Sequence, residues 1–250
     1  MQDGKILKVK YDAYDDSEYS SVGRISRFVP DNKTVLDVGC STGYLGRLLL
    51  KKGCTLYGIE GNPLAAGKAA EIYREVWVLD LDGFAGIKGT HPLFDIIVFG
   101  DILEHLKDPK RLLQQMRGLL KDDGRVIISL PNVANWSMRF HVLRGKFDYV
   151  PYGVLDETHL RFFHPDSAGE MLENAGFLIV DMDVTPGVDK LVPYKRFIHP
   201  LFGRFAWYRH LEYRLSRWRP GLFAHQMIFV AVKADRSDGT GKSPFMQESG

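Results

Sequence analysis

The stretch TVLDVGCSTGYLG, from Thr34 to Gly46, decides the fold of this chain. Its first residues are apolar, β-branched and uninterrupted, which is typical of a buried strand. Small residues follow from Gly39 to Gly43, and a helical pattern starts at Tyr44. Small residues at a strand-to-helix turn indicate that a ligand comes close to the backbone there.

Strand and helix patterns alternate outward from this turn. Further apolar runs of strand length cover residues 54–60, 75–80, 94–100, 125–130, 177–184 and 221–234. The predicted helices begin at Tyr44, Pro63, Pro109 and Pro165, and the third is expected to continue through Leu120 to a stop at Asp123 and Gly124. This alternation predicts an α/β fold with a doubly wound, seven-stranded, mostly parallel sheet. Its ligand should bind beyond the carboxyl ends of the strands, beside the first strand.

Composition narrows the class of protein. A chain of 250 residues fits one large domain or one domain with an insertion, and its net charge of +2 does not indicate a nucleic-acid binder. Cys40 and Cys54 are too few for a disulfide framework, so we expect a reducing, cytoplasmic setting. No secretory leader is visible at the N-terminus, and no apolar run reaches the ~18 residues that cross a bilayer.

Three carboxylates stand at predicted strand ends: Asp37, Glu60 and Asp80. They are poor neighbours for a pyrophosphate, and the turn lacks the G-x-G-x-x-G spacing of dinucleotide folds. They suit a ligand with a cationic end and ribose hydroxyls, because carboxylates accept hydrogen bonds from both. A nicotinamide-dependent oxidoreductase on a similar sheet remains the alternative.

The successive motifs resemble those of class I S-adenosylmethionine-dependent methyltransferases. Between Thr34 and Asn132 they read VLDVGCSTGYLG, YGIEGNP, VLDLD, FDIIVFGDILEHLKDP and GRVIISLPN. A later stretch, VLDETHLRFFHPDSAGEMLENAGF, is similar to a small-molecule subgroup likened to the methionine-biosynthesis protein MetW. The resemblance implies a Rossmann-like methyltransferase domain over 34–234, with a helical insertion before the last strand. It also implies methyl transfer to an oxygen, or alternatively a nitrogen or carbon, of a small-molecule or glycan-type acceptor.

The resemblance also implies which residues bind S-adenosylmethionine. Asp37 and Gly39 would contact the methionine portion, and Gly43 would let the backbone come close to it. Glu60 would bind the ribose, and Asp80 and Leu81 the adenine. Gly100 and Asp101 would lie below the methyl group, and Cys40 and Gly61 are assigned to the same cofactor site. Asp82 is a near neighbour that could replace Asp80. Ser41 stands where the family has its middle glycine, and we expect the serine to fit unless its φ is positive.

Methyl transfer to a hydroxyl needs alignment and a base that takes the proton. Two histidines are candidates, His105 after the fourth strand and His159 before the sixth. The alternative for His105 is a role in helix capping or core packing, and for His159 local hydrogen bonding.

Three further residues are assigned to the acceptor pocket: Tyr14, Glu157 and Arg161. Tyr11 or Tyr14 would act as a lid within the N-terminal segment 1–33, or would pack on the sheet edge. We expect no metal ligands. The alternative is that Asp101, Glu104 and His105 hold Mg²⁺, as a similar cluster does in some methyltransferases of the ubiquinone pathway.

Nucleic acid is an unexpected substrate, because GDIL at 100–103 replaces the Asn/Asp-Pro-Pro-aromatic run of enzymes that methylate base amines.

The segment 192–219 is basic and aromatic, with Leu201, Phe205, Tyr208, Leu211, Leu215 and Trp218 on one helical stripe. It is interpreted as a core-packed helix, a lid over an anionic substrate, or a peripheral membrane contact. Residues 235–250 are expected to be a disordered tail. Oligomeric state is not readable from the sequence.

Overall fold

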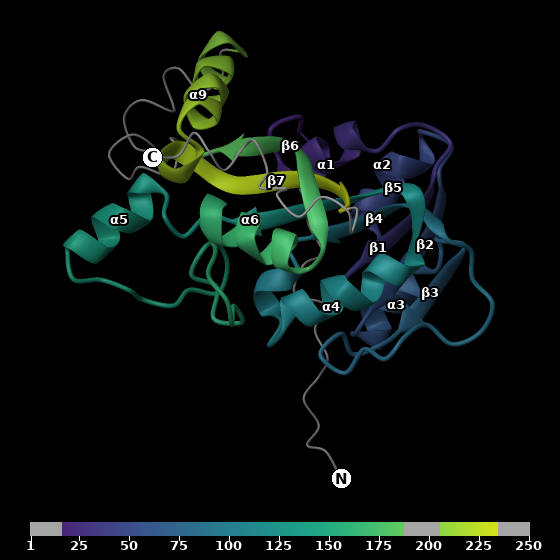
Figure 1. Cartoon of the computed structure of the whole chain (residues 1–250). Coiled ribbons are helices and arrows are strands. Elements are labelled where there is room, and N and C mark those ends of the chain that lie inside the picture. Colours follow the sequence, from purple (N-terminus) through teal and green to yellow (C-terminus); the bar gives the residue numbers. More distant parts are fainter. Residues whose placement is uncertain (1–16, 188–205, 235–250) are drawn as a thin grey trace.

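A seven-stranded sheet forms the centre of the computed structural model, which describes residues 17–187 and 206–234 (Figure 1). The strands lie in the order β3-β2-β1-β4-β5-β7-β6. Their bounds are β1 (Thr34–Val38), β2 (Thr55–Glu60), β3 (Glu75–Val78), β4 (Phe94–Gly100), β5 (Leu120–Pro131), β6 (Phe177–Pro186) and β7 (Ala224–Lys233).

The first five strands of this order are parallel, and β7 is antiparallel to both β5 and β6. The chain passes from β1 to β2 on one side and later adds β4 on the other side of β1. The carboxyl ends of β1 and β4 therefore form the point where the strand order reverses, which is where such sheets bind ligands. The predicted doubly wound, mostly parallel sheet is confirmed.

Helices cover both faces of the sheet. They are α1 (Ser21–Phe28), α2 (Tyr44–Leu50), α3 (Pro63–Ala69), α4 (Pro109–Met116), α5 (Trp136–Leu143), α6 (Pro165–Asn174), α9 (Ala206–Trp218) and α10 (Pro220–Phe223), with short 3₁₀ helices η1 (Leu103–His105) and η2 (Arg117–Leu119). Neighbouring strand residues point to opposite faces, so Val35 joins a buried cluster with α1, α2 and α3, whereas Leu36 joins another with α4 and α6.

Two predicted helix starts are confirmed by their caps. Asn62 Oδ1 accepts from the backbone N–H of Leu64 at 2.9 Å, and Asp108 Oδ1 accepts from that of Arg111 at 3.0 Å. A proline follows each cap and fixes the first helical residue.

The predicted end of the third helix is wrong. α4 ends at Met116, a 3₁₀ turn containing Gly118 follows, and Leu120 already pairs with Phe94 as the first residue of β5. Leu120 is apolar because it is fully buried in the sheet core and not because it extends the helix. Its spacing from Leu112 and Leu113 fits a helix by coincidence.

Three helices were not predicted from the sequence: α1 within the N-terminal segment, α5 after β5, and α10, which takes up the first residues of the predicted strand 221–234. Tyr11, Tyr14, residues 188–205 and the predicted tail 235–250 lie outside the described residues. Within the predicted insertion 192–219, the described residues form α9. Across 17–187 and 206–234, no helix combines the length and apolar character that crossing a bilayer needs.

Candidate active site at the carboxyl edge of the sheet

The glycine turn, residues 39–43, joins β1 to α2 at the switch point. Gly39 has φ +78° and Gly43 has φ +82°, a left-handed backbone that glycine adopts without strain. A Cβ added at Gly39 would lie 2.8 Å from Cγ1 of Ile102, and one at Gly43 would lie 2.8 Å from Cδ1 of Ile72. Both positions therefore require glycine for conformation and for space.

Ser41 also has a positive φ, of +48°. The exception named for the serine therefore applies, and this conformation costs a non-glycine residue about 1–2 kcal/mol. The backbone N–H of Ser41 donates to Oε2 of Glu60 at 2.8 Å, and this charge-assisted bond helps hold the turn.

Glu60 ends β2 and connects two loops. Its Oε2 accepts from Ser41, and its Oε1 accepts from the backbone N–H of Asn62 at 2.8 Å, across Gly61. A carboxylate oxygen has more than one lone pair, so both oxygens can still accept from a ligand hydroxyl. This geometry is compatible with the ribose role predicted for Glu60.

Asp37 lies buried under the glycine turn, where the hydroxyl of Tyr73 donates to its Oδ2 at 2.5 Å. Burial raises the pKa of Asp37 to about 7 and the nearby charge of Glu60 adds to this, while the bond from Tyr73 opposes it. A cationic ligand group beside Asp37 would favour the ionised carboxylate. A cation bound there would therefore offset the cost of ionising the buried carboxylate of Asp37.

Asp80 and Leu81 follow β3 at the same edge. Asp80 is exposed, and its Oδ1 accepts from the backbone N–H of Asp82 at 3.1 Å. The carboxylate of Asp82 is instead engaged by the backbone N–H of Lys107 at 2.9 Å. Of the two alternatives for the adenine contact, Asp80 has the less occupied carboxylate among the described contacts. Leu81 is half-buried against the core.

Asp101 follows Gly100 at the end of β4, with φ +53°. Its Oδ1 accepts from the Ser129 hydroxyl at 2.7 Å, and its Oδ2 accepts from the Ser21 hydroxyl at 3.0 Å. The Asp101 backbone N–H donates back to Ser129 Oγ at 3.0 Å. These bonds fix Asp101 between β5 and α1.

Two adjoining hollows open at this edge. The inner hollow, about 10 Å³, has walls that include Ser21, Ile25, Asp37, Gly39, Cys40, Tyr44, Gly100 and Asp101. The outer hollow, about 170 Å³, has walls that include Tyr44, Asp101, Glu104, His105, Asp156, His159, His225 and Gln226. Tyr44 and Asp101 belong to both, so a group leaving one hollow would enter the other between these two residues.

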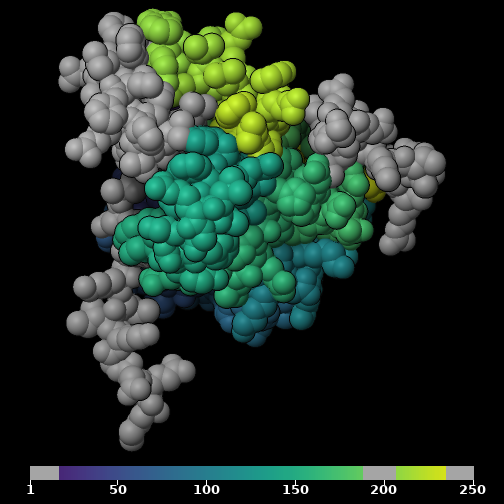
Figure 2. Space-filling view, turned by 90° about the vertical axis from the view of Figure 1, so that its left-hand side faces the viewer, coloured from purple at the N-terminus to yellow at the C-terminus, as the bar shows by residue number. Residues whose placement is uncertain are grey.

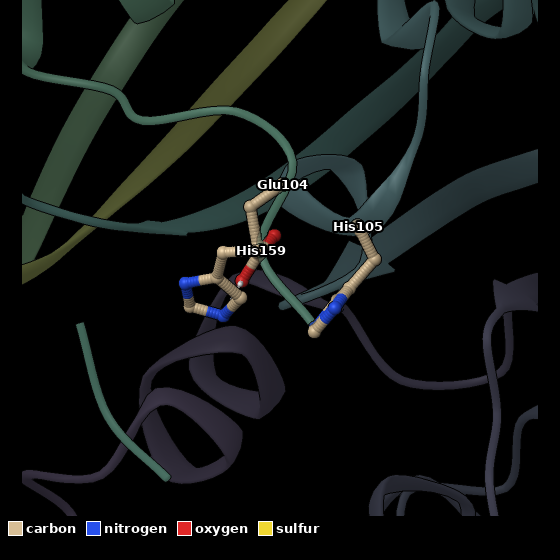
Figure 3. Close-up of side chains that lie close together, drawn as sticks. All are labelled: Glu104, His105 and His159. Atoms are coloured by element: carbon tan, nitrogen blue, oxygen red, sulfur yellow. Dashed lines mark ion pairs between the residues drawn. The ribbon is translucent and has the colours of Figure 1, made fainter. Parts of the chain in front are cut away.

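Both candidate histidines line the outer hollow, with ring centroids 4.8 Å apart (Figure 3). His159 is buried, and its Nδ1 lies 3.0 Å from the carbonyl oxygen of Val154. The Nδ1 of His105 lies 3.2 Å from the carbonyl oxygen of Thr158. A carbonyl can only accept, so these contacts favour the tautomer with the proton on Nδ1, which in a neutral ring leaves Nε2 as the basic atom. The Nδ1 of His105 also lies 3.0 Å from the Thr158 hydroxyl, which itself donates to Oδ1 of Asp156 at 2.6 Å.

Glu104 is buried beside the histidines, with Oε1 3.9 Å from Nε2 of His159. Burial raises its pKa well above the usual range, and the charges of Asp101 and Asp156 add to this. No described residue gives its Oε2 a hydrogen bond. Three side chains here are close enough to share a cation: Glu104, His105 and His159. A carboxylate oxygen of the first and a ring nitrogen of each histidine all lie within 4.8 Å of one another.

The residues assigned to the acceptor pocket are dispersed. Arg161 is exposed and its guanidinium donates to the carbonyl oxygen of Lys107 at 2.6 Å, and Glu157 is also exposed. Neither is among the described residues that line the two hollows. Tyr14 lies outside the described residues.

Several residues of the site were not predicted from the sequence. They are Tyr44 at the shared wall, Tyr73 beneath Asp37, and Asp156, His225 and Gln226 in the outer hollow. The sequence could have indicated Tyr44, because this residue directly follows the glycine turn. His225 and Gln226 begin the antiparallel strand β7, and only the pairing of Gln226 with Pro131 brings them to this edge.

The chain belongs to a methyltransferase family. Residues 11–181 match the family described as "Methyltransferase domain". The fold is that of class I S-adenosylmethionine-dependent methyltransferases, as in a protein of this class from Archaeoglobus fulgidus (TM-score 0.58, 18% identity, covering 85% of this chain and 92% of the other). The resemblance to the class is therefore confirmed, and S-adenosylmethionine is the cofactor of this class. The MetW-like subgroup stays a prediction.

Two further similarities lie within the same class. The chain is 27% identical over 157 residues to ubiquinone biosynthesis O-methyltransferase of Coxiella burnetii, and the match covers 60% of this chain and 65% of that protein. The chain thus spans a little under two thirds of this curated relative. The 1,6-didemethyltoxoflavin-N1-methyltransferase of Burkholderia thailandensis, solved with S-adenosylhomocysteine, has a TM-score of 0.53 at 17% identity, covering 87% of this chain and 80% of the other.

Proposed function

We propose that this protein transfers the methyl group of S-adenosylmethionine to a hydroxyl oxygen of a small-molecule or glycan-type acceptor. The observation that carries the proposal is the pair of adjoining hollows, with carboxylates around the inner one and two histidines in the outer one. The name of the curated relative from Coxiella burnetii, an O-methyltransferase, supports oxygen as the acceptor atom.

The cofactor would lie along the glycine turn with its methionine end at the mouth of the inner hollow, which at about 10 Å³ is too small to enclose it. Asp37 would face its cationic methionine end, Glu60 its ribose, and Asp80 with Leu81 its adenine. The sulfonium methyl group would then lie between Tyr44 and Asp101, where the hollows meet. Because a sulfonium is already an activated donor, the protein mainly has to align the acceptor and exclude water.

The acceptor would bind in the outer hollow with its hydroxyl near His159. As the oxygen attacks the methyl carbon, the carbon–sulfur bond breaks and the hydroxyl proton passes to Nε2 of His159. The bond from Nδ1 to Val154 holds the ring in the required tautomer. The resulting imidazolium would favour ionisation of Glu104, whose Oε1 lies 3.9 Å from Nε2 of His159. His105, the second candidate base, would orient the acceptor.

The test is a screen of phenolic, sugar and other hydroxylated metabolites with S-adenosylmethionine labelled in its methyl group. We expect a labelled methyl ether. Label found on nitrogen or carbon would refute the oxygen assignment while leaving methyl transfer intact. Failure to bind S-adenosylhomocysteine in calorimetry, with binding of NAD instead, would refute methyl transfer itself.

Histidine variants test the assignment of the base. We expect His159→Ala to lower turnover by ~10²-fold or more at unchanged affinity for S-adenosylhomocysteine. His105→Ala should lower turnover less and raise KM. The matched control is His141→Ala, an exposed imidazole on α5 that is not among the described lining residues of either hollow. Unchanged turnover in His159→Ala would remove it from the mechanism, and a ~10²-fold loss in His105→Ala alone would assign the base to His105.

A further inference from the structure

α9 turns an apolar stripe away from the protein. Trp207, Leu211 and Trp218 are 59%, 46% and 69% exposed, and at 100° per residue they fall within about 40° of one another around the helix. The side chains that α9 buries are instead polar, Glu212 and Ser216. Of the predicted stripe, Leu211 and Trp218 are exposed, whereas Tyr208 and Leu215 are half-buried. The interpretation as a helix that packs this stripe into the core therefore holds only in part for the described residues.

The inner face of α9 is fixed by a polar network. The Tyr213 hydroxyl donates to Oδ1 of Asp183 in β6 at 2.7 Å, and Arg24 of α1 donates to Oδ2 of the same carboxylate at 3.2 Å. The Arg24 guanidinium also lies 3.9 Å from the centre of the Tyr213 ring. These contacts hold the helix so that its apolar stripe points outward.

α5 and the chain after it form a second exposed apolar surface. Leu143 is 84% exposed, which is unusual for a leucine, and Val142, Phe140, Phe147 and Tyr152 are all about half exposed or more. Large apolar side chains gathered on one surface indicate an interaction site.

Both surfaces lie at the same end of the sheet. The Nδ2 of Asn132, between β5 and α5, donates to the carbonyl oxygens of Pro220 at 3.1 Å and Ala224 at 3.0 Å, which joins α10 to the base of α5. Figure 2 looks onto this end and shows α5 and the following chain in teal, with α9 and α10 in yellow-green above them.

The charge of these helices is strongly positive. Residues 136–152 carry three cations and one carboxylate, Asp148, and residues 206–219 carry four cations and the single, buried Glu212. The local net charge is thus +5 in a chain whose total is +2, so the rest of the chain is net negative. The cations are Arg139, Arg144, Lys146, Arg209, Arg214, Arg217 and Arg219.

We propose that the exposed faces of α5 and α9 form one docking surface for an anionic lipid bilayer. Tryptophan and leucine would enter the interface while the arginines pair with lipid phosphates, which is how amphipathic helices bind membranes without crossing them. Each cation near such a surface strengthens binding roughly fivefold. The outer hollow opens at the same end, because Gly153 and Val154 of its wall follow Tyr152. The proposal does not depend on methyl transfer, since binding is measured without turnover.

The experiment is cosedimentation of the full chain with vesicles of phosphatidylcholine mixed with phosphatidylglycerol, against phosphatidylcholine alone. We expect binding to the anionic vesicles that weakens with added salt. Leu143→Ser combined with Trp218→Ser should weaken partitioning about tenfold or more, from the lost apolar burial. Arg144→Gln combined with Arg214→Gln should weaken it roughly thirtyfold at low salt.

The control is Leu50→Ser combined with Lys51→Gln, an exposed leucine followed by an exposed cation at the end of α2. α2 runs from the carboxyl edge back to the opposite edge of the sheet, so this variant should bind vesicles like the wild type. Thermal unfolding and binding of S-adenosylhomocysteine show that each variant is folded. Absence of wild-type binding, or equal loss in the control, would overturn the proposal. A different result would assign the surface to a second copy of the chain. In that case the wild type would not bind vesicles, light scattering would show it to be a dimer, and Leu143→Ser combined with Trp218→Ser would abolish the dimer.

Discussion

Asp37→Asn tests whether the carboxyl under the glycine turn is destabilising when it is ionised. Folding raises the pKa of Asp37 from 3.8 to about 7, so between these values the native state holds a proton that the unfolded state has released. The free energy of unfolding therefore falls as pH rises through this window. At about 1.4 kcal/mol per pKa unit, the full loss is about 4 kcal/mol above the upper value.

The asparagine variant has no such proton, and its amide oxygen can still accept from Tyr73. We therefore expect Asp37→Asn to exceed the wild type in stability by up to about 4 kcal/mol at pH ~8 and by only about 1 kcal/mol at pH ~4.5. Urea unfolding followed by tryptophan fluorescence across this range measures the difference. Glu71→Gln, which removes an exposed carboxylate near α3, is the control and should show no such trend. A stability difference between Asp37→Asn and wild type that stays constant with pH would refute the reasoning.

The same carboxyl links pH to cofactor binding. A bound cation stabilises the ionised form of Asp37, so the affinity for S-adenosylmethionine should rise with pH until about 7 and then level off. In Asp37→Asn the affinity should be lower and this dependence should be lost. Calorimetric titration at several pH values checks both expectations, and a pH-independent wild-type affinity would contradict them.

Three further predictions concern the turn, the ribose contact and the histidine cluster. Ser41→Gly should raise the free energy of unfolding by up to about 1 kcal/mol, because glycine accepts the left-handed backbone, and urea unfolding would expose the opposite sign if the turn is not strained. Glu60→Ala should weaken S-adenosylhomocysteine binding by roughly 1–3 kcal/mol, which calorimetry measures, and unchanged affinity would exclude the ribose role. A chelator should leave turnover unchanged, because the proposed proton transfer to His159 uses no metal. Loss of activity that Mg²⁺ restores would instead assign a cation to Glu104, His105 and His159.

The succession of strands along the chain and the position of the glycine turn could be predicted from the sequence because they depend on local patterns. An apolar β-branched run, glycines and a strand-end acid are all readable within a few residues, as at Asp37 and Gly39. Backbone strain at Ser41 was not readable, since a residue name does not fix φ. The early end of α4 was missed because Leu120 suits a buried helix and a buried strand equally well.

The rest of the candidate site depends on long-range placement. His225 reaches the outer hollow only because β7 inserts antiparallel beside β5, and Tyr73 supports Asp37 from a loop after α3. The outward orientation of Trp218 is likewise set by the network between α9 and β6, which periodicity does not reveal. The individual site roles remain predictions that the variants above address.

The insertion of β7 between β5 and β6 also determines how the chain can mature during synthesis. β6 emerges from the ribosome before β7, yet β7 is the strand that joins it to the sheet. Until β7 has been made, β5 and β6 each present an unpaired edge, and such edges favour association with other nascent chains. A chain that ends before Ala224 would therefore contain the glycine turn but could not complete its sheet, and its exposed strand edges would favour binding by chaperones.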